Sequence, residues 1–342
     1  MMKKRFLPLL LCLMLLTACT ASGETTYQKN SHYFFGTFDT MISLTAYTKT
    51  QEEFQTYASL AESEMRRYHY IFDLYNDYPN VNNLYAVNAN APQGPTPAEP
   101  ELIDLLLLIR SWHEQYSTQA NPAMGSVLTL WHDARTQGNF LPDGDALQKA
   151  SAHTDFSQVI IDEEAQTIAF ADPEIRLDLG AVAKGYAAQL VADTLRGAGL
   201  DSFLFNAGGN VVCGGAPLDG REYWTIAIED VDGSTMRIML GAVNQSVVTS
   251  GDYQRYYEFN GERYHHLIDP ETLYPARHMR AVSIIHPDSG LADFLSTTAF
   301  LLPYEQSRAL IESIPEAEAL WTLYDGSEWA TDGFQALVDR VQ

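Results

Sequence analysis

The chain has 342 residues, of which 46% are apolar and 19% charged, and its 21 Lys and Arg against 44 Asp and Glu give a formal net charge of -23. This composition is typical of a globular protein with a large core and excludes a disordered or fibrous chain. The acidic excess argues against nucleic-acid binding, because little positive charge is available to neutralise phosphates. Three cysteines in this length exclude a disulfide scaffold.

The first residues have the features of an export signal. A basic start at residues 3–5 precedes the apolar run 6–16, which is too short to span a bilayer comfortably. An uncleaved membrane anchor is the alternative, but the segment Leu16-Thr17-Ala18-Cys19 looks like a bacterial lipobox. We therefore predict a signal peptide over 1–18, a lipid on Cys19, a tether over 19–30, a folded domain over 31–342, and a location on the extracytoplasmic face of the cell membrane.

Periodicity predicts the elements of the first half. Alternating polar and apolar residues predict a strand at 38–47. Apolar residues recurring every three or four positions predict helices at 51–75, 101–116 and 124–134. The segment 76–100 is rich in Asn and Pro and is expected to form a loop, and a turn is expected at 138–144.

The second half contains most of the predicted strands. They fall at 157–161, 166–170, 174–178, 203–206, 209–213, 222–229, 236–240, 244–249, 254–259, 263–268 and 279–286. Helices are predicted at 181–196, 291–302 and 304–314. Strand runs interleaved with helices predict an α+β fold with a mixed, largely antiparallel sheet. No break in composition divides the chain, so one large domain is expected, with Cys213 as a small buried hydrophobic residue.

The segment from Arg176 to Tyr186 is the first with possible chemistry. A strand is predicted to end at Leu179, with a turn at Gly180 and a helix following. Free N–H groups at a helix start favour an anion, Lys184 adds a positive charge, and Asp178 can accept hydrogen bonds. Taken alone, however, the spacing fits an ordinary strand–turn–helix with a solvated lysine better.

Two other segments contain paired residues of one type. Gly208 and Gly209 permit a tight turn or a close backbone approach to a ligand, and a plain hairpin turn is the better interpretation of the pair alone. His265 and His266 fall in a predicted strand, so their side chains point to opposite faces and only one can serve a given site. A histidine followed three residues later by Asp269 could be a base with an orienting carboxylate.

The last segment of interest lies in a predicted helix. Asp293 and Thr297 are four residues apart and therefore share a face. Their oxygens are of the kind that Mg²⁺ prefers. Read alone, Asp293 is better explained as a first-turn carboxylate that interacts with the helix dipole.

Taken together, these segments resemble the FAD:protein FMN transferase family, also called the ApbE flavin transferases. The family pattern D-L-G-x-x-A-K-G-Y-A, N-A-G-G, T-S-G-x-Y, H-x-I-D-P and A-D-x-x-S-T is matched in order at 178–187, 206–209, 249–253, 266–270 and 292–297. Gly36-Thr37, Tyr75 and the stretch 125–131 also match. The match covers essentially all of the predicted mature chain, and eight segments in the right order are specific.

The resemblance implies an enzyme that binds FAD and Mg²⁺, joins FMN to a Thr or Ser hydroxyl of a partner protein and releases AMP. It implies that Ala181 (through its carbonyl), Asp293 and Thr297 hold the metal. His266 becomes the expected base, with Asp269 orienting it or the metal. The implied FAD contacts are Phe35, Tyr75, Asn121, Asp178, Lys184, Gly208, Gly209, Thr249, Ser250 and His265.

The chain departs from the family pattern at three places. Phe35 stands where the family often has Met, and Asn121-Pro122-Ala123 stands where Asp-Pro-Thr is usual. Leu273 replaces a Gly, and we expect that turn to change shape because Leu adopts a positive φ less readily.

Two other functions fit the same residues. An FAD pyrophosphatase would use the same site with water in place of the hydroxyl. A non-catalytic flavin-binding lipoprotein would need no metal-activated phosphoryl site. The family-type acceptor sequence Asp-Gly-x-x-Ser/Thr-Ala-Thr is absent from the chain, so the expected acceptor is another exported or membrane protein.

Overall fold

The computed structural model describes residues 26–232 and 235–342. Its main element is an eight-stranded sheet in which each neighbouring pair is antiparallel. From edge to edge the strands are β1 (Gln28–Thr37), β2 (Thr40–Thr48), β6 (Phe203–Ala207), β7 (Asn210–Cys213), β10 (Ser246–Gly251), β13 (Met279–His286), β14 (Glu318–Leu323) and β15 (Glu328–Ala330). The predicted α+β class with a largely antiparallel sheet is confirmed.

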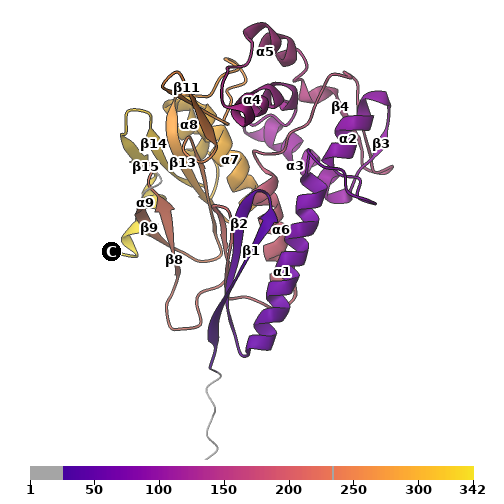
Figure 1. The fold of residues 1–342 in the computed structure, drawn as a ribbon. Coiled ribbons are helices and arrows are strands. Elements are labelled where there is room, and N and C mark those ends of the chain that lie inside the picture. Colours follow the sequence, from indigo (N-terminus) through magenta and orange to yellow (C-terminus); the bar gives the residue numbers. More distant parts are fainter. Residues whose placement is uncertain (1–25, 233–234) are drawn as a thin grey trace, which may run out of the picture.

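Long helices cover one face of this sheet (Figure 1). They are α1 (Gln51–Phe72), α6 (Ala183–Gly197), α7 (Ser289–Leu301) and α8 (Tyr304–Glu312). The Thr50 side chain caps α1 by accepting a hydrogen bond from the Glu53 N–H. Every residue of α7 is buried. A helix that is apolar on most sides needs neighbours all round, and α7 has them in α6, α8, β10 and β13.

A smaller layer covers the opposite face. It consists of β8 (Trp224–Glu229), β9 (Met236–Ala242) and α9 (Asp332–Asp339), whose apolar side chains pack onto Val211, Val247 and Ile285 of the main sheet. Figure 1 shows this layer on the side away from α1. Cys213 lies fully buried in this second core as a free thiol, as the sequence predicts.

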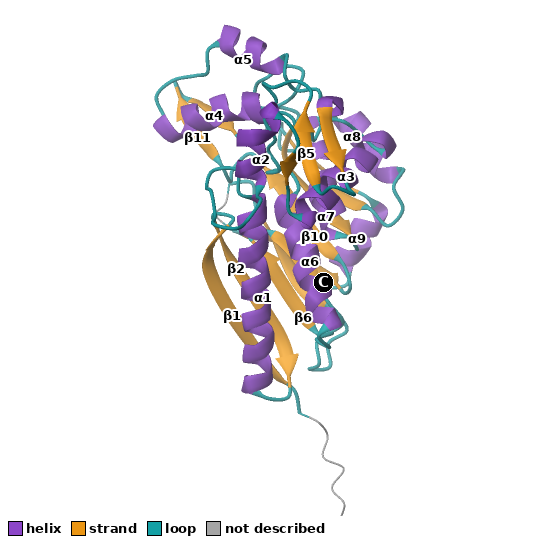
Figure 2. Cartoon of the chain, turned by 90° about the vertical axis from the view of Figure 1, so that its right-hand side faces the viewer, coloured by secondary structure: helices purple, strands orange, loops and turns teal. Residues whose placement is uncertain are grey.

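Shorter elements gather at one end of the molecule, opposite the start of β1 (Figure 2). The helices are α2 (Leu84–Asn90), η1 (Ala91–Gln93), α3 (Pro100–Gln115), α4 (Gly125–Gln137), α5 (Gly144–Ser151) and η2 (Phe156–Gln158). The strands are β3 (Thr96–Pro97), β4 (Val159–Asp162), β5 (Thr167–Phe170), β11 (Tyr256–Phe259) and β12 (Glu262–His265). The β11–β12 hairpin pairs with no other strand among the described residues.

Two predicted segments take a different form. Helix α2 lies inside the predicted loop 76–100, because Asn83 caps it at the Ala86 N–H and Val87 is buried in the core. The predicted strand at 174–178 is absent. The Asn88 side chain there bonds both backbone groups of Leu177 at 2.8 and 2.9 Å, in place of a neighbouring strand.

The ends of the chain also differ from expectation. Strand β1 begins at Gln28, so the last residues of the predicted tether are already in the sheet. β1, β14, β15, α5 and α9 were not predicted, being short, weakly periodic or, for β1, largely polar. The predicted signal peptide, Cys19 and the first part of the tether lie outside the described residues. Among residues 26–232 and 235–342, none of the helices combines the length and the apolar character needed to span a bilayer.

Candidate active site

A cavity of about 760 Å³ lies between the shorter elements and the main sheet. Its walls come from α4, the start of α6, one side of α7, β10, the turn between β1 and β2, and the segments before and after the β11–β12 hairpin. Ten of the residues predicted for the site line it: Tyr75, Asn121, Asp178, Ala181, Lys184, Thr249, Ser250, His266, Asp293 and Thr297. The structure therefore brings together motifs that are far apart in the sequence.

The start of α6 forms the charged floor of the cavity. The Asp178 carboxylate accepts a hydrogen bond from the Gly180 N–H at 2.7 Å, which fixes the turn into the helix. Lys184 lies in the first turn, and its Nζ is 3.4 Å from Asn210 Oδ1. Burial lowers the pKa of Lys184 and raises that of Asp178. An ammonium group that is partly removed from solvent is stabilised by a nearby anion. This part of the cavity therefore suits a phosphate.

Oxygen atoms converge beside Lys184. Asp293 Oδ2 accepts from the Gly185 N–H at 2.8 Å. The Thr297 hydroxyl lies 3.4 Å from the Ala181 carbonyl oxygen and 3.4 Å from Ser250 Oγ. Burial raises the pKa of Asp293 to about 6, even though Lys184 and the Gly185 N–H lower it.

This oxygen set fits a hard cation. A carboxylate, a hydroxyl and a carbonyl are ligands that Mg²⁺ accepts, with water and substrate phosphate completing its shell. A divalent cation would also compensate the carboxylate that burial disfavours. Among the described residues no three His, Cys, Asp or Glu side chains form a metal cluster, so a cation here would depend on the carbonyl and hydroxyl oxygens.

His266 faces the cavity from just beyond the end of β12. Its backbone N–H donates to the Arg255 carbonyl at 3.1 Å, while its Nδ1 is buried with no hydrogen-bond partner. Burial lowers the pKa of the imidazole to about 3, and the nearby charges of Arg255, Arg135 and Lys184 lower it further. The ring is therefore neutral near pH 7 and has a free nitrogen that can accept a proton.

The sequence interpretation missed the basic residues of the cavity wall. His132 and Arg135 lie one turn apart on α4, and His132 Nδ1 is 3.2 Å from the Tyr75 hydroxyl and 3.3 Å from Arg135 Nη2. Arg255 donates to the Phe38 carbonyl at 3.3 Å. Within the described chain, no carboxylate lies within ion-pair distance of Arg135, Arg255 or Lys184. The three-residue spacing on α4 was the only available signal.

Four predicted FAD contacts, Phe35, Gly208, Gly209 and His265, lie away from the cavity. Phe35 is on β1 with 63% of its surface exposed. Phe38, three residues on in the β1–β2 turn, lines the wall in its place. Gly208 and Gly209 have φ of 59° and 96° and form the two-residue turn between β6 and β7. They serve a hairpin, because a turn with two positive φ values strongly favours glycine.

His265 and Asp269 are also outside the cavity wall. His265 is buried on the other face of the strand, with its Nε2 2.9 Å from the Ala276 carbonyl oxygen. The Asp269 carboxylate accepts from the Glu271 N–H and the Thr272 hydroxyl, so it holds the Asp-Pro turn and is not bonded to His266. The prediction that His265 and His266 point to opposite faces is in agreement with these positions, and His265 does not line the cavity.

The departures from the family pattern have structural explanations. Leu273 does adopt a positive φ, 63°, so the expected change of turn shape is wrong. Its burial and the bond from Trp131 Nε1 to its carbonyl at 2.9 Å offset the strain of that conformation. Asn121 lines the cavity, but its side chain donates a hydrogen bond to the Thr154 carbonyl and accepts one from the Ala123 N–H.

The fold and the cavity define the class of protein: an α+β domain with one large site suited to a phosphorylated ligand. A sequence model described as the ApbE family matches residues 38–321. The FAD:protein FMN transferase of Treponema pallidum (strain Nichols) is 35% identical over 274 residues, which cover 76% of this chain and 75% of that protein. The FAD:protein FMN transferase of Klebsiella pneumoniae (strain 342) is 31% identical over 254 residues, covering 72% and 78%.

Solved structures have the same fold. The ApbE protein of Thermotoga maritima superimposes with a TM-score of 0.81 at 26% identity, over 91% of this chain and 99% of that one. The flavin transferase ApbE of Vibrio cholerae does so with a TM-score of 0.77 at 21% identity, over 91% and 100%. The chain belongs to the ApbE family and is a transferase enzyme.

Proposed function

We propose that the protein transfers the FMN part of FAD to a Thr or Ser hydroxyl of an acceptor protein and releases AMP. One observation carries this proposal. A half-buried His266, whose Nδ1 has no hydrogen-bond partner, lies in the same cavity as a carboxylate–hydroxyl–carbonyl cluster and as Lys184, which forms no ion pair among the described residues. Attack of a hydroxyl on a phosphoryl group needs a base, positioning and charge neutralisation, and this cavity contains groups for each.

The charge of the cavity supports FAD as the donor substrate. The chain has a net charge of -23, so its overall field repels a diphosphate. Lys184, Arg135 and Arg255 nevertheless face one cavity without carboxylate partners among the described residues. The volume of about 760 Å³ lies within the range of pockets that bury a ligand of this kind. Tyr75 and Phe38 offer aromatic surface at the rim for a ring system.

The oxygens of Ala181, Asp293 and Thr297 would hold Mg²⁺. When bound, the ion supplies charge neutralisation at the phosphates as a Lewis acid. The chain's own contribution is to fix these oxygens. The Gly185 N–H orients the Asp293 carboxylate, and the Ala181 carbonyl and Ser250 hydroxyl orient Thr297.

His266 is the proposed base. The acceptor hydroxyl oxygen forms a bond to the phosphorus on the FMN side of the diphosphate, and the bond from that phosphorus to the bridging oxygen breaks. The hydroxyl proton passes to the His266 imidazole, and AMP leaves with the bridging oxygen. Lys184, Arg135 and Arg255 stabilise the charge that develops on the phosphoryl oxygens. A diphosphate bound beside these cations raises the pKa of His266 by offsetting their repulsion, which makes the imidazole a better base.

The test is a transfer assay on the soluble form of the enzyme. The protein is incubated with FAD, Mg²⁺ and an acceptor domain that carries the family-type sequence Asp-Gly-x-x-Ser/Thr-Ala-Thr. Mass spectrometry of the acceptor and chromatography of AMP and FMN are the readouts. Covalent FMN on the acceptor with one AMP released per transfer supports the proposal. Equal release of free FMN and AMP with an unmodified acceptor would identify an FAD pyrophosphatase instead.

We further propose that Cys19 is lipidated and holds the enzyme on the extracytoplasmic face of the membrane. The basic start, the apolar run and the Leu-Thr-Ala-Cys segment support this. A diacylglycerol with a further acyl chain would anchor the chain firmly. Cys19→Ser should give an unprocessed precursor or a released protein, measured by fractionation and by the mass of the mature N-terminus. Normal processing and membrane retention of that variant would contradict the proposal.

A further inference from the structure

The β11–β12 hairpin carries the two cavity residues Arg255 and His266 at its ends, yet main-sheet pairing does not fix its position. Its two strands pair only with each other among the described residues. The His266 N–H to Arg255 carbonyl bond closes the base of the hairpin. Backbone bonds from the Asp252 N–H to the Arg280 carbonyl and from the Ala276 N–H to the Leu267 carbonyl hold its two flanks, and side-chain contacts add to them. On one side, Tyr257 and Tyr264 pack against the Trp131 cluster of α4.

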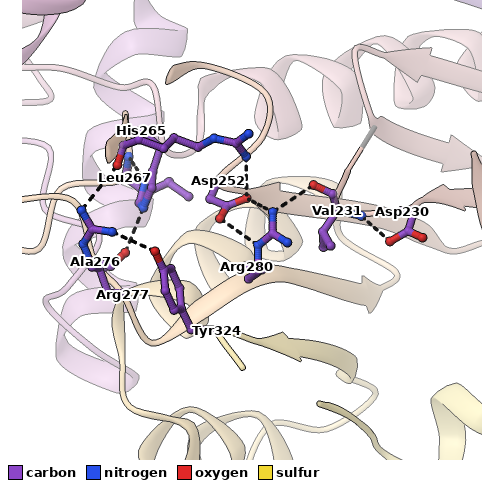
Figure 3. A network of polar contacts seen from close by, with 10 residues as sticks. Asp230, Val231, Asp252, His265, Leu267, Ala276, Arg277, Arg280 and Tyr324 are labelled. Carbon is purple, nitrogen blue, oxygen red and sulfur yellow. Dashed lines mark hydrogen bonds and ion pairs between the residues drawn. The ribbon is translucent and has the colours of Figure 1, made fainter. Parts of the chain in front are cut away.

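A buried carboxylate holds the other side. Asp252, which directly follows β10, is 4% exposed and accepts from Arg280 Nε of β13 at 3.1 Å. Its Oδ1 is 3.8 Å from Arg263 Nη1 of β12. The Arg263 guanidinium also lies 4.0 Å from the centre of the Tyr256 ring on β11. Figure 3 shows Asp252 between Arg280 and the segment that contains His265. Asp252 thus ties the main sheet to both strands of the hairpin.

His265 makes the second tie. Its Nε2 donates to the Ala276 carbonyl at 2.9 Å and its Nδ1 accepts from the Leu267 N–H at 3.3 Å, so both ring nitrogens are used (Figure 3). The ring stands edge-on to Phe300 of α7 at 5.5 Å. Helix α7 also carries Asp293 and Thr297. Burial lowers the pKa of His265 to about 4, so the ring stays in this neutral form near pH 7.

We infer that Asp252 and His265 are positioning residues that set the place of His266 in the cavity, an inference that rests on the proposed role of His266. Side chains alternate along β12, so anchoring Arg263 and His265 on one face directs Tyr264 and His266 to the other. Tyr264 then stacks on Trp131, and His266 lines the cavity. A small shift of a reacting group can cost about 10²-fold in rate, so this anchoring matters for transfer.

The first test measures position without depending on chemistry. Hydrogen exchange of the segment 252–268 is followed by mass spectrometry in the wild-type protein, His265→Leu and Asp252→Asn. Arg221→Gln is the control, because it removes an exposed ion pair, with Asp219, that joins residues outside the hairpin. Faster exchange in the two variants and not in the control supports the inference. Unchanged exchange in both overturns it, whether or not the protein proves to be a transferase.

The second test asks whether the effect passes through His266. We expect His265→Leu and Asp252→Asn to lower kcat roughly 10- to 100-fold with FAD affinity nearly unchanged. His265→Gln keeps a donor for the Ala276 carbonyl and should recover most of the rate. In a His266→Ala background the same substitutions should add no further loss, because the group that they position is gone. A full additional loss in that background would show that the two residues do not act through His266.

Discussion

The two walls of the cavity are built in different ways. The α6–α7 wall is fixed by backbone packing, since Gly185 lets the first turn of α6 lie directly against Asp293 and the Ser289 carbonyl. The hairpin wall, with Arg255 and His266, is held by side chains from β10, β13, α4 and α7. The oxygen cluster thus depends mainly on the packing of α6 against α7, and the base depends largely on side-chain contacts of the hairpin. Substitutions should therefore damage one without damaging the other.

The largest effect is expected at the helix wall. Asp293→Ala removes the charged ligand of the cluster and should lower transfer by about 10³-fold or more, because charge stabilisation worth several kcal/mol is lost. Asp288→Ala is the control: it removes the cap that accepts from the Leu291 N–H, at a cost of about 1 kcal/mol of stability. Transfer rates against Mg²⁺ concentration should change only for Asp293→Ala. Wild-type turnover of that variant in a chelator would remove Mg²⁺ from the mechanism.

The next effect belongs to the hairpin wall. His266→Ala should lower the transfer rate roughly 10²- to 10⁴-fold, the usual range for general acid–base help. FAD affinity, measured by flavin fluorescence, should change much less, because the imidazole acts on the acceptor hydroxyl. Normal transfer by the variant would refute the assignment. Loss of FAD binding alone would make His266 a substrate contact.

The pH dependence of Mg²⁺ affinity should also distinguish the helix wall from the hairpin wall. Burial raises the pKa of Asp293 to about 6, and metal binding requires the carboxylate. Below pH 6, protons compete, so the affinity for Mg²⁺ should fall by up to about tenfold per pH unit. Above pH 6 the carboxylate is charged and affinity should level off. Calorimetric titration with Mg²⁺ between pH 5 and 8 measures this, and a flat profile would show that Asp293 does not bind the ion.

The smallest effect tests the backbone packing of α6. A Cβ at Gly185 would overlap Asp293 Cβ and the Ser289 carbonyl, so Gly185→Ala should cost about 1–3 kcal/mol and weaken Mg²⁺ binding. Gly197→Ala, at the end of the same helix, meets open space and should be neutral or slightly stabilising. Thermal unfolding of the pair measures the contrast. Equal stabilities would mean that α6 and α7 can separate without cost.

Three of the predicted residues that line the cavity share one property. Lys184, Asp293 and Thr297 lie on helices whose periodicity fixes which residues share a face, so their grouping was readable. Phe35, Gly208 and Asp269 lie in or beside turns, where one residue of offset sends a side chain elsewhere or commits it to the turn itself. Neither Arg135 nor Arg255 belongs to one of the sequence motifs that pointed to the site. Their meeting depends on the placement of α4 relative to β10.

The sequence by itself determined the class of fold, the long helices, the central strands and the order of motifs that places the chain in the ApbE family. These follow from periodicity and local residue chemistry, which act over a few turns of chain. Only the tertiary structure decided that Arg135 and Arg255 line the same cavity, that Asn88 replaces a strand at 174–178, and that Leu273 accepts a left-handed conformation. Each of these depends on contacts between distant segments, whose packing outweighs local preference.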